Sequence, residues 1–208
     1  SRGRYPLTEL DQAALYRPLT KWTRRIDRAD EIPSTVRTAF KAMTTGKPGA
    51  AHIGVPYDIQ KQAVSEGDLW CQPEHGCYPA WRAAPEKSAV EAAAAAILAA
   101  KNPVFLCGGG VVIAGAMDEL SRIALMLGAP VCTTISGQGS LAEDHPLCAG
   151  VVGSNGGVPA TRAVVDCADL VVFVGCRAGS TATEHWRAPG RDIAIVHTPA
   201  GEASWYVN

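Results

Sequence analysis

Three consecutive glycines, Gly108 to Gly110, follow the apolar stretch 103–107 and precede a segment with helical periodicity. Glycine lets a backbone approach a phosphate closely and adopt positive φ, and a helix N-terminus offers unpaired N–H groups to an anion. The stretch reads GGGVVIAG, which matches neither GxGxxG nor a Walker loop. Tight strand-to-helix turns also use glycine for packing alone. The triplet therefore leaves two interpretations open, a phosphate cradle and a packing turn.

Two further loops carry polar groups that suit the same chemistry, because hydroxyl and guanidinium groups donate hydrogen bonds to phosphate. One loop follows the residues PVC and the other follows LVVFV. The loops at the carboxyl ends of parallel strands lie at one edge of the sheet, where ligands bind. The cofactor-binding candidates are Gly108, Gly109, Gly110, Thr133, Thr134, Gly175 and Arg177. We expect no catalytic residue and no metal ligand in this chain.

The elements that position these loops alternate between helices and strands. Apolar runs without alternation predict strands that are buried on both faces, which is typical of a parallel sheet covered by helices on both sides. The predicted fold is therefore an α/β, doubly wound, Rossmann-like sheet. Helices are predicted over 86–102, 117–128 and 158–169, with Gly128 at a helix C-cap, and strands over 103–107, 130–134, 170–175 and 192–197.

The N-terminal part has a different organisation. Val36, Ala39, Phe40 and Met43 form one helical stripe, which predicts an amphipathic helix, and the stretch 49–59 predicts a short buried strand. Beyond it the periodicity lapses into a segment with proline, glycine and isolated aromatic residues, which is typical of a linker. We therefore divide the chain into an N-terminal α/β tail segment (1–60), a linker (61–85) and a main domain (86–208).

Composition excludes several classes of function. The chain has 208 residues, a net charge of -1 and 47% hydrophobic residues, so it carries no charge excess for nucleic acid or an acidic membrane. It has seven cysteines without a CxxC pair, which we interpret as reduced thiols of a cytoplasmic protein, with Cys107, Cys132 and Cys176 as small core residues. The N-terminus shows neither a signal peptide nor an initiator methionine, and we expect a piece of a longer protein.

Five separated motifs occur in the order and at the spacing seen in thiamine-diphosphate-dependent enzymes of the acetolactate synthase type. They read RPLTKWTRRI, IPSTVRTAFKAMTTGKPGAAHIGVPYDI, ILAAKNPVFLCGGGV, ELSRIALMLGAPVCTTISGQGSLAEDHPLCAG and CADLVVFVGCR. The chain resembles this family over nearly all of its length. The resemblance implies that residues 1–60 are the C-terminal part of the pyrimidine-binding domain and that residues 86–208 are the central domain.

The resemblance also implies that some functional parts of the enzyme lie outside this sequence. The family needs a glutamate on the pyrimidine-binding domain and a GDG with a downstream asparagine to hold Mg²⁺ on thiamine diphosphate. The only GD here is Gly67-Asp68, in the linker. We therefore expect this chain alone to be inactive. The parent enzyme is expected to be a homo-oligomer, a dimer or tetramer, that decarboxylates or ligates 2-oxo acids or related small molecules.

In several family members the central domain binds FAD or ADP, and in others it binds nothing. The candidates Gly108 to Gly110, Thr133, Thr134, Gly175 and Arg177 match the family's loops around that nucleotide. Thr198 and Pro199, however, replace an acidic segment of the FAD-binding relatives, which weakens the FAD interpretation.

Three single residues allow a functional or a structural interpretation. His145 could be an acid-base residue or tie a loop, His52 fits a core or interface histidine, and Lys21 could face an active-site entrance or form an ion pair. Two other functional classes remain open: a stand-alone nucleotide-dependent oxidoreductase, and a non-catalytic module that senses ADP or coenzyme A.

Overall fold

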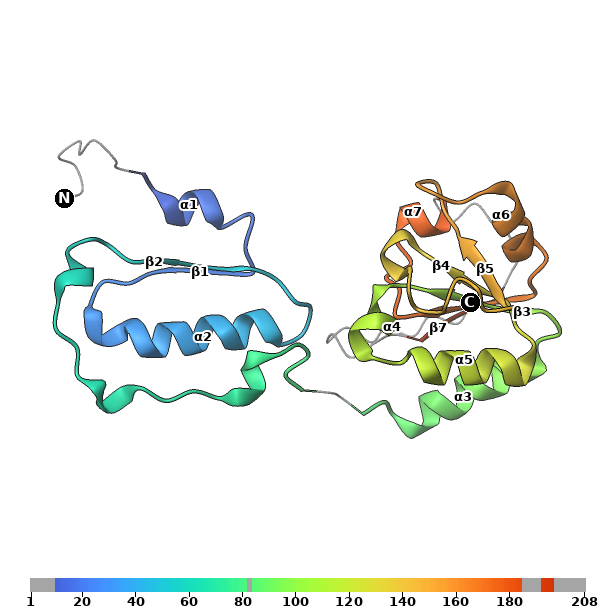
Figure 1. Cartoon of the computed structure of the whole chain (residues 1–208), viewed down its shortest axis with the longest axis horizontal. Coiled ribbons are helices and arrows are strands. Elements are labelled where there is room, and N and C mark those ends of the chain that lie inside the picture. The colour runs from blue at the N-terminus through green and yellow to red at the C-terminus, as the bar shows by residue number, and fades with distance from the viewer. Residues whose placement is uncertain (1–9, 82–83, 185–191, 197–208) are drawn as a thin grey trace. The chain divides into compact units, whose positions relative to one another are not determined.

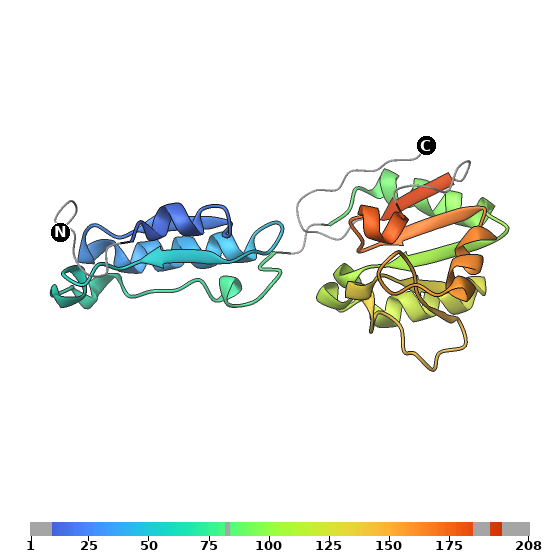
Figure 2. The same cartoon turned by 90° about the horizontal axis from the view of Figure 1, so that it is seen from above.

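A computed structural model describes residues 10–81, 84–184 and 192–196 of the chain. The chain divides into two compact units, Ser1–Arg82 and Ala83–Asn208. Figures 1 and 2 show the elements of each unit.

The first unit is built on two parallel strands, β1 (Trp22–Arg25) and β2 (Ala51–Gly54). The short helix α1 (Gln12–Tyr16) and the longer helix α2 (Ile32–Thr44) lie on opposite sides of this pair (Figure 1). The core of the unit centres on three buried residues, Ile26, Ala29 and Ile59. The predicted helix and strand are thereby confirmed, while α1 and β1 are additional.

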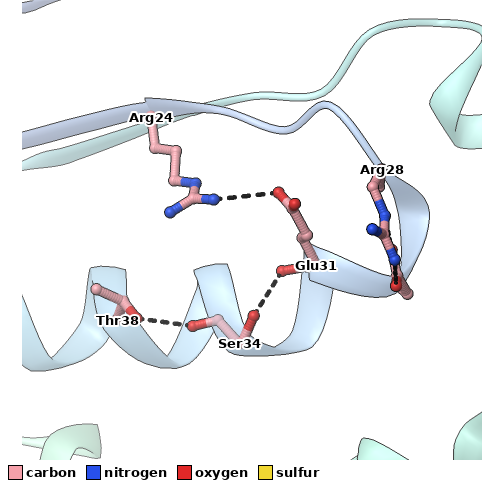
Figure 3. Close-up of polar contacts among 6 residues, drawn as sticks. Arg24, Arg28, Glu31, Ser34 and Thr38 are labelled. Atoms are coloured by element: carbon pink, nitrogen blue, oxygen red, sulfur yellow. Dashed lines mark hydrogen bonds and ion pairs between the residues drawn. The ribbon is translucent and has the colours of Figure 1, made fainter.

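Polar contacts fix the start of α2 against β1 (Figure 3). Arg24 of β1 forms an ion pair with Glu31 at a nitrogen–oxygen distance of 3.1 Å. The Ser34 hydroxyl donates to the Glu31 carbonyl (3.0 Å), and the Thr38 hydroxyl donates to the Ser34 carbonyl (2.8 Å). An adjacent ion pair joins Arg28 to Asp30. The helix therefore starts at a defined place beside the strand.

The stretch after β2 runs back along α2. It contains three short 3₁₀ turns, Ile59–Lys61, Glu66–Asp68 and Pro73–Gly76. The Ala80 amide donates to the Thr44 carbonyl (3.3 Å), and the Tyr78 hydroxyl donates to the Gly46 carbonyl (3.1 Å). Much of the stretch with linker-like composition is thus attached to the first unit.

The second unit contains a five-stranded parallel sheet in the order β5-β4-β3-β6-β7. From the central strand β3 the chain passes to one side, through β4 to β5, and then crosses β3 to the other side, where β6 and β7 lie. This is the doubly wound arrangement that the sequence predicts. The strands are β3 (Pro103–Cys107), β4 (Val131–Thr133), β5 (Cys148–Val151), β6 (Leu170–Val174) and β7 (Asp192–Val196).

Helices cover both faces of this sheet (Figure 1). On one face, α3 (Lys87–Ala99), α4 (Gly109–Ala114) and α5 (Met117–Leu127) pack on Phe105 and Cys107. On the other face, α6 (Pro159–Asp166) and α7 (Ser180–Thr183) pack near Val104 and Leu106. Alternate residues of β3 therefore serve two cores, which explains why its apolar run has no polar alternation.

The predicted apolar stripes are only partly buried. On α3, Ile97 is buried, whereas Leu98 is 75% exposed. On α2, Ala39 is buried, while Val36 and Phe40 keep 38% and 46% of their surface exposed. The α2 stripe therefore leaves apolar surface uncovered beside the stretch that follows β2.

Candidate functional site at the sheet edge

Three of the predicted loops meet at the carboxyl edge of the sheet. They follow β3 and its two neighbours, β4 and β6, so they lie where the winding direction reverses. The Gly108 amide donates to the Val174 carbonyl (2.9 Å), and the Gly110 amide donates to the Gly175 carbonyl (3.0 Å). The Thr134 amide donates to the carbonyl of Cys107 (2.9 Å). Backbone hydrogen bonds thus tie the loops after β3, β4 and β6 together.

The glycines allow this close approach between loops. A Cβ atom on Gly108 would overlap the Gly175 carbonyl oxygen and lie 2.7 Å from the Cys176 Cα. A Cβ on Gly109 would lie 2.7 Å from the Ser136 carbonyl oxygen. No member of the triplet has positive φ, whereas Gly175 does, at +58°. The need for glycine therefore follows from contact with neighbouring backbone.

The same contacts occupy backbone N–H groups that a phosphate-binding loop would need to keep free. Gly110 donates to the β6 loop, and Val111 donates to the Gly108 carbonyl (3.2 Å). Among the described residues, Gly109 is the glycine of the triplet whose amide has no backbone acceptor. Helix α4 has six residues, so it provides a weak N-terminal dipole. The structure brings the predicted glycines together as a packed turn, and nucleotide binding by them stays a prediction.

The polar candidates lie beside these glycines. Thr133 is buried at the end of β4, Thr134 is partly buried, and Arg177 is exposed. Within the described part of the chain, neither the two hydroxyls nor the guanidinium has a hydrogen-bond partner. Arg177 acts electrostatically on the adjacent Cys176 thiol, although burial has the larger effect and raises the pKa of that thiol. Arg177 and Thr134 are therefore accessible to a ligand, whereas only 4% of the surface of Thr133 is exposed.

Ala178 marks a strained turn in the loop after β6. It has φ +48°, a left-handed conformation that side chains rarely adopt, and it is buried. Its amide donates to the Cys176 sulfur at 3.3 Å. Such strain costs on the order of 1–3 kcal/mol and concentrates at functional sites. The sequence carries no signal for this conformation, because alanine is not a typical left-handed residue.

A fourth loop, after β5, belongs to the same edge. The Ser154 amide donates to the Thr181 carbonyl (3.0 Å), and a Cβ on Gly153 would overlap that carbonyl oxygen. Gly153 itself has φ +105°. This loop was not among the predicted site residues, although its composition, GSNGG, resembles that of the other loops.

Buried thiols near this edge are chemically inert. Burial raises the pKa of the Cys107 and Cys132 thiols to about 12. A thiol with such a pKa is almost entirely protonated at neutral pH and is a poor nucleophile. These cysteines therefore act as small core residues, as the sequence indicates.

Both ring nitrogens of His145 make local contacts. The Leu147 amide donates to its Nδ1 atom (3.2 Å), which assigns the proton of the neutral ring to Nε2. Nε2 lies 3.3 Å from the Ser121 hydroxyl on α5. The histidine thereby ties the loop before β5 to a helix.

The two candidates in the first unit are likewise held by local contacts. His52 lies 2.8 Å, through Nδ1, from the Thr23 hydroxyl and stacks on Tyr16 with ring centroids 4.2 Å apart. The Lys21 ammonium donates to the carbonyls of Thr45 and Lys47, the latter at 2.8 Å. Lys21 therefore caps the C-terminal end of α2, and it forms no ion pair with another of the described residues.

Within the described ranges, no group of three or more His, Cys, Asp or Glu residues could hold a metal ion. No helix in this part of the chain is long and apolar enough to span a membrane. Thr198 and Pro199 lie outside the described residues.

Comparison with known proteins identifies the family. The family described as thiamine pyrophosphate enzyme, central domain, matches residues 90–203. The chain belongs to this family, and the resemblance to enzymes of the acetolactate synthase type is confirmed.

The chain is 36% identical, over 94% of its length, to a protein of Methanocaldococcus jannaschii named "Probable acetolactate synthase large subunit", of which it covers 33%. It is 32% identical to the acetolactate synthase large subunit of Corynebacterium glutamicum, over 91% of this chain and 30% of that protein. The chain thus spans about a third of the length of these relatives.

A solved structure confirms the fold. Benzoylformate decarboxylase from Polynucleobacter necessarius superimposes with a TM-score of 0.73, covering 92% of this chain and 35% of that chain. The sequences are 22% identical, so this similarity bears on the fold alone.

Proposed function

We propose that this chain is part of a thiamine-diphosphate-dependent enzyme that decarboxylates or ligates 2-oxo acids, as an acetolactate synthase does. Residues 1–60 are assigned to the end of its pyrimidine-binding domain, 61–85 to the connection and 86–208 to the central domain. The similarity to synthase large subunits over 94% of the chain supports this proposal. By the same resemblance, the parent is proposed to be a cytoplasmic homo-oligomer.

The second unit serves this enzyme as a scaffold. One observation carries that assignment: the positions of Cβ atoms on Gly108, Gly109 and Gly175 are taken by neighbouring backbone atoms. The loops at the sheet edge therefore brace one another. When bound in the parent enzyme, thiamine diphosphate would supply the nucleophilic carbon for the reaction of the 2-oxo acid. We assign the ligands of its diphosphate and of Mg²⁺ to polypeptide outside this chain, because the GDG motif that holds them in the family does not occur in this sequence.

Calorimetry with thiamine diphosphate and Mg²⁺ tests this assignment. We expect this chain to show no tight binding and no consumption of pyruvate, and a longer polypeptide that also carries the missing motifs to show both. Micromolar, Mg²⁺-dependent binding by the 208-residue chain would contradict the proposal.

A second candidate function for the sheet edge is binding of an adenine nucleotide, FAD or ADP. The observation in its favour is that Arg177 and Thr134 have no side-chain hydrogen-bond partner among the described residues, beside the point where the winding reverses. In this site the Arg177 guanidinium and the two threonine hydroxyls donate to phosphate, and the free amide of Gly109 adds a donor. Gly108, Gly110 and Gly175 shape the turn.

Thermal denaturation with ADP, FAD and coenzyme A at millimolar concentration separates the two roles. A bound nucleotide raises the melting temperature by mass action. Arg177→Ala should then weaken its affinity at least about tenfold, or roughly 1.4 kcal/mol, without lowering the unliganded melting temperature. Arg122→Ala is the matched control, because Arg122 is an exposed arginine of α5 that pairs with Glu119. If none of the three compounds shifts the wild-type midpoint, the edge is a scaffold only.

A further inference from the structure

The loop after β5 contains the single Asn-Gly pair of the sequence, Asn155-Gly156. The other two asparagines are Asn102, which precedes Pro103, and Asn208 at the end of the sequence. In an Asn-Gly pair the backbone nitrogen of the glycine can attack the side-chain carbonyl carbon of the asparagine and form a cyclic imide. Proline has no backbone N–H for this reaction, whereas glycine has no side chain to hinder it. The residue types therefore place this chemistry at Asn155.

Hydrogen bonds fix the base of this loop. The Gly157 amide donates to the Gly153 carbonyl (3.0 Å), which closes a tight turn, and the Ser154 amide donates to the Thr181 carbonyl of α7 (3.0 Å). Close packing adds to these bonds, because a Cβ on Gly157 would lie 2.7 Å from the Gly153 carbonyl oxygen. The base of the turn is therefore held in place, and the two residues between Ser154 and Gly157 form its tip.

Both reacting groups lie at the tip of the turn. Asn155 and Gly156 are exposed, and among the described residues neither the Asn155 side chain nor the Gly156 amide has a hydrogen-bond partner within the protein. An amide that is bonded to a protein acceptor must first break that bond, which costs free energy, before its nitrogen can attack. The Gly156 nitrogen and the Asn155 side chain are free of this cost.

Gly156 also gives the backbone room to rotate into the reactive geometry. It has φ +150°, a conformation that glycine adopts readily and other residues rarely adopt. The atoms nearest to its Cβ position are side-chain carbons of Ile135 and Val151, at 3.5 Å or more. The tip can therefore bring the Gly156 nitrogen toward the side-chain carbonyl carbon without displacing neighbouring backbone.

We propose that Asn155 is a site of spontaneous deamidation in the folded protein. The Gly156 nitrogen forms a bond to Cγ of Asn155 and gives up its proton, the bond from Cγ to Nδ2 breaks, and Nδ2 takes a proton through water and leaves as ammonia. Water then opens the cyclic imide. Its attack at Cγ gives an aspartate with the ordinary main chain, and its attack at the main-chain carbonyl carbon gives an isoaspartate.

The two products change the loop in different ways. Both carry a carboxylate, which is ionised at neutral pH and adds negative charge to the loop. In the isoaspartate the main chain also runs through the former side-chain carbons, which lengthens the segment between Ser154 and Gly157. The hydrogen bond that closes the turn then cannot keep its geometry. Because Ser154 is tied to Thr181, we expect the contact of this loop with α7 to loosen.

Incubation of the folded 208-residue chain at mildly alkaline pH, followed by peptide mass spectrometry, tests the site. We expect the peptide that contains position 155 to gain the mass difference between an amide and a carboxyl group, and chromatography to resolve an aspartate and an isoaspartate form. A sample digested before the incubation gives the background. Asn102 is the internal control, because Pro103 follows it, and it should keep its amide. Asn155→Gln should suppress both products, because glutamine would have to close a larger ring.

A second measurement separates the effect of the charge from that of the longer main chain. Freshly prepared Asn155→Asp carries the charge on an unchanged main chain, whereas the isoaspartate form carries both changes. Hydrogen exchange of the Gly157 amide, followed by NMR, should be at least about tenfold faster in the isoaspartate form than in Asn155→Asp. The Gly108 amide, which bonds to the Val174 carbonyl in another loop, is the control and should exchange at the same rate in both.

Three results would overturn the proposal in different ways. If Asn155 keeps its amide in the folded protein but loses it in the urea-unfolded chain, the folded turn blocks ring closure and the site does not exist in the native state. Aspartate without isoaspartate would indicate direct hydrolysis and exclude the cyclic imide. Equal exchange of the Gly157 amide in the isoaspartate form and in Asn155→Asp would refute the loosening of the loop.

Discussion

Replacing Gly108 by alanine tests whether contact between loops determines the glycine triplet. The new Cβ would overlap the Gly175 carbonyl oxygen and approach the Cys176 Cα to 2.7 Å, whereas ordinary contacts begin at 3.4 Å. The β3 and β6 loops must then separate by roughly 1 Å to restore ordinary contact with the Gly175 carbonyl oxygen, which lengthens the bond from the Gly108 amide to the Val174 carbonyl. Overpacking costs about 1–3 kcal/mol and a weakened hydrogen bond about 0.5–1.5 kcal/mol. We expect Gly108→Ala to lower the free energy of unfolding by about 3 kcal/mol.

Gly179→Ala is the matched control in the neighbouring loop. Gly179 has φ -67°, and no heavy atom lies within 4 Å of its Cβ position, so this change should stay within about 1 kcal/mol of the wild type. The assay is urea unfolding followed by thiol labelling of Cys107 and Cys132, which are buried in the second unit and report on that unit alone. If Gly108→Ala costs no more than Gly179→Ala, packing does not explain the glycine and the reasoning fails.

Two further predictions concern thiols and acid stability. At pH 8 iodoacetamide should modify the exposed cysteines Cys71, Cys77 and Cys167. It should leave Cys107 and Cys132 intact until the protein unfolds, because burial raises the pKa of these two thiols to about 12. Modification of Cys107 or Cys132 in the folded protein, detected by peptide mass spectrometry, would disprove this prediction. The Asp169 carboxylate accepts hydrogen bonds from the backbone amides of Lys101 (2.7 Å) and Asn102 (2.9 Å). These bonds lower the pKa of Asp169 below its ordinary value of 3.8. The stabilisation of the folded state by the ionised carboxylate is therefore present above pH 3.8 and is lost as the pH falls through the folded-state pKa. Asp169→Asn should therefore unfold at lower urea concentration than the wild type at pH 7, with a gap that narrows below pH 3.8; a constant gap down to pH 3 would exclude this role.

The sequence predicted the elements whose signals are local. The α2 helix, the apolar runs of β3 and β6, and the cap at Gly128 all appear where periodicity and glycine placed them. Gly128 adopts φ +61°, as a helix C-cap requires.

Strands stabilised by their neighbours were not predicted. β1 reads WTRR and is a polar, four-residue strand. β5 reads CAGV; it contains Gly150 at φ +95° and pairs with β4 through a register shift. Both depend on a partner strand more than on their own propensity, so their residues gave no usable pattern.

The candidate site was predictable in position but not in its contacts. Parallel strands bring the loops at their carboxyl ends to one edge, so the proximity of Gly108, Thr134 and Gly175 follows from topology. Which acceptor each amide finds is a tertiary property, and so is the left-handed turn at Ala178. The attachment of residues 69–76 to α2 was not predicted for a related reason: these residues have the composition of a linker, and the contacts of Arg37 and His75 that attach them are tertiary.

The closed loops limit how any nucleotide could bind at the sheet edge. In doubly wound sheets the ligand enters a crevice between the loops on either side of the switch point. Here the Gly110 amide and the Gly175 carbonyl bridge that crevice, and a Cβ on Gly175 would lie 2.6 Å from the Val111 nitrogen. A nucleotide must therefore rest on top of the bridged loops and depend on side chains, chiefly the exposed Arg177, more than on backbone amides. The affinity for the nucleotide would then fall as the ionic strength rises. The contacts that brace the loops would not weaken in the same way, because they are backbone hydrogen bonds and close packing.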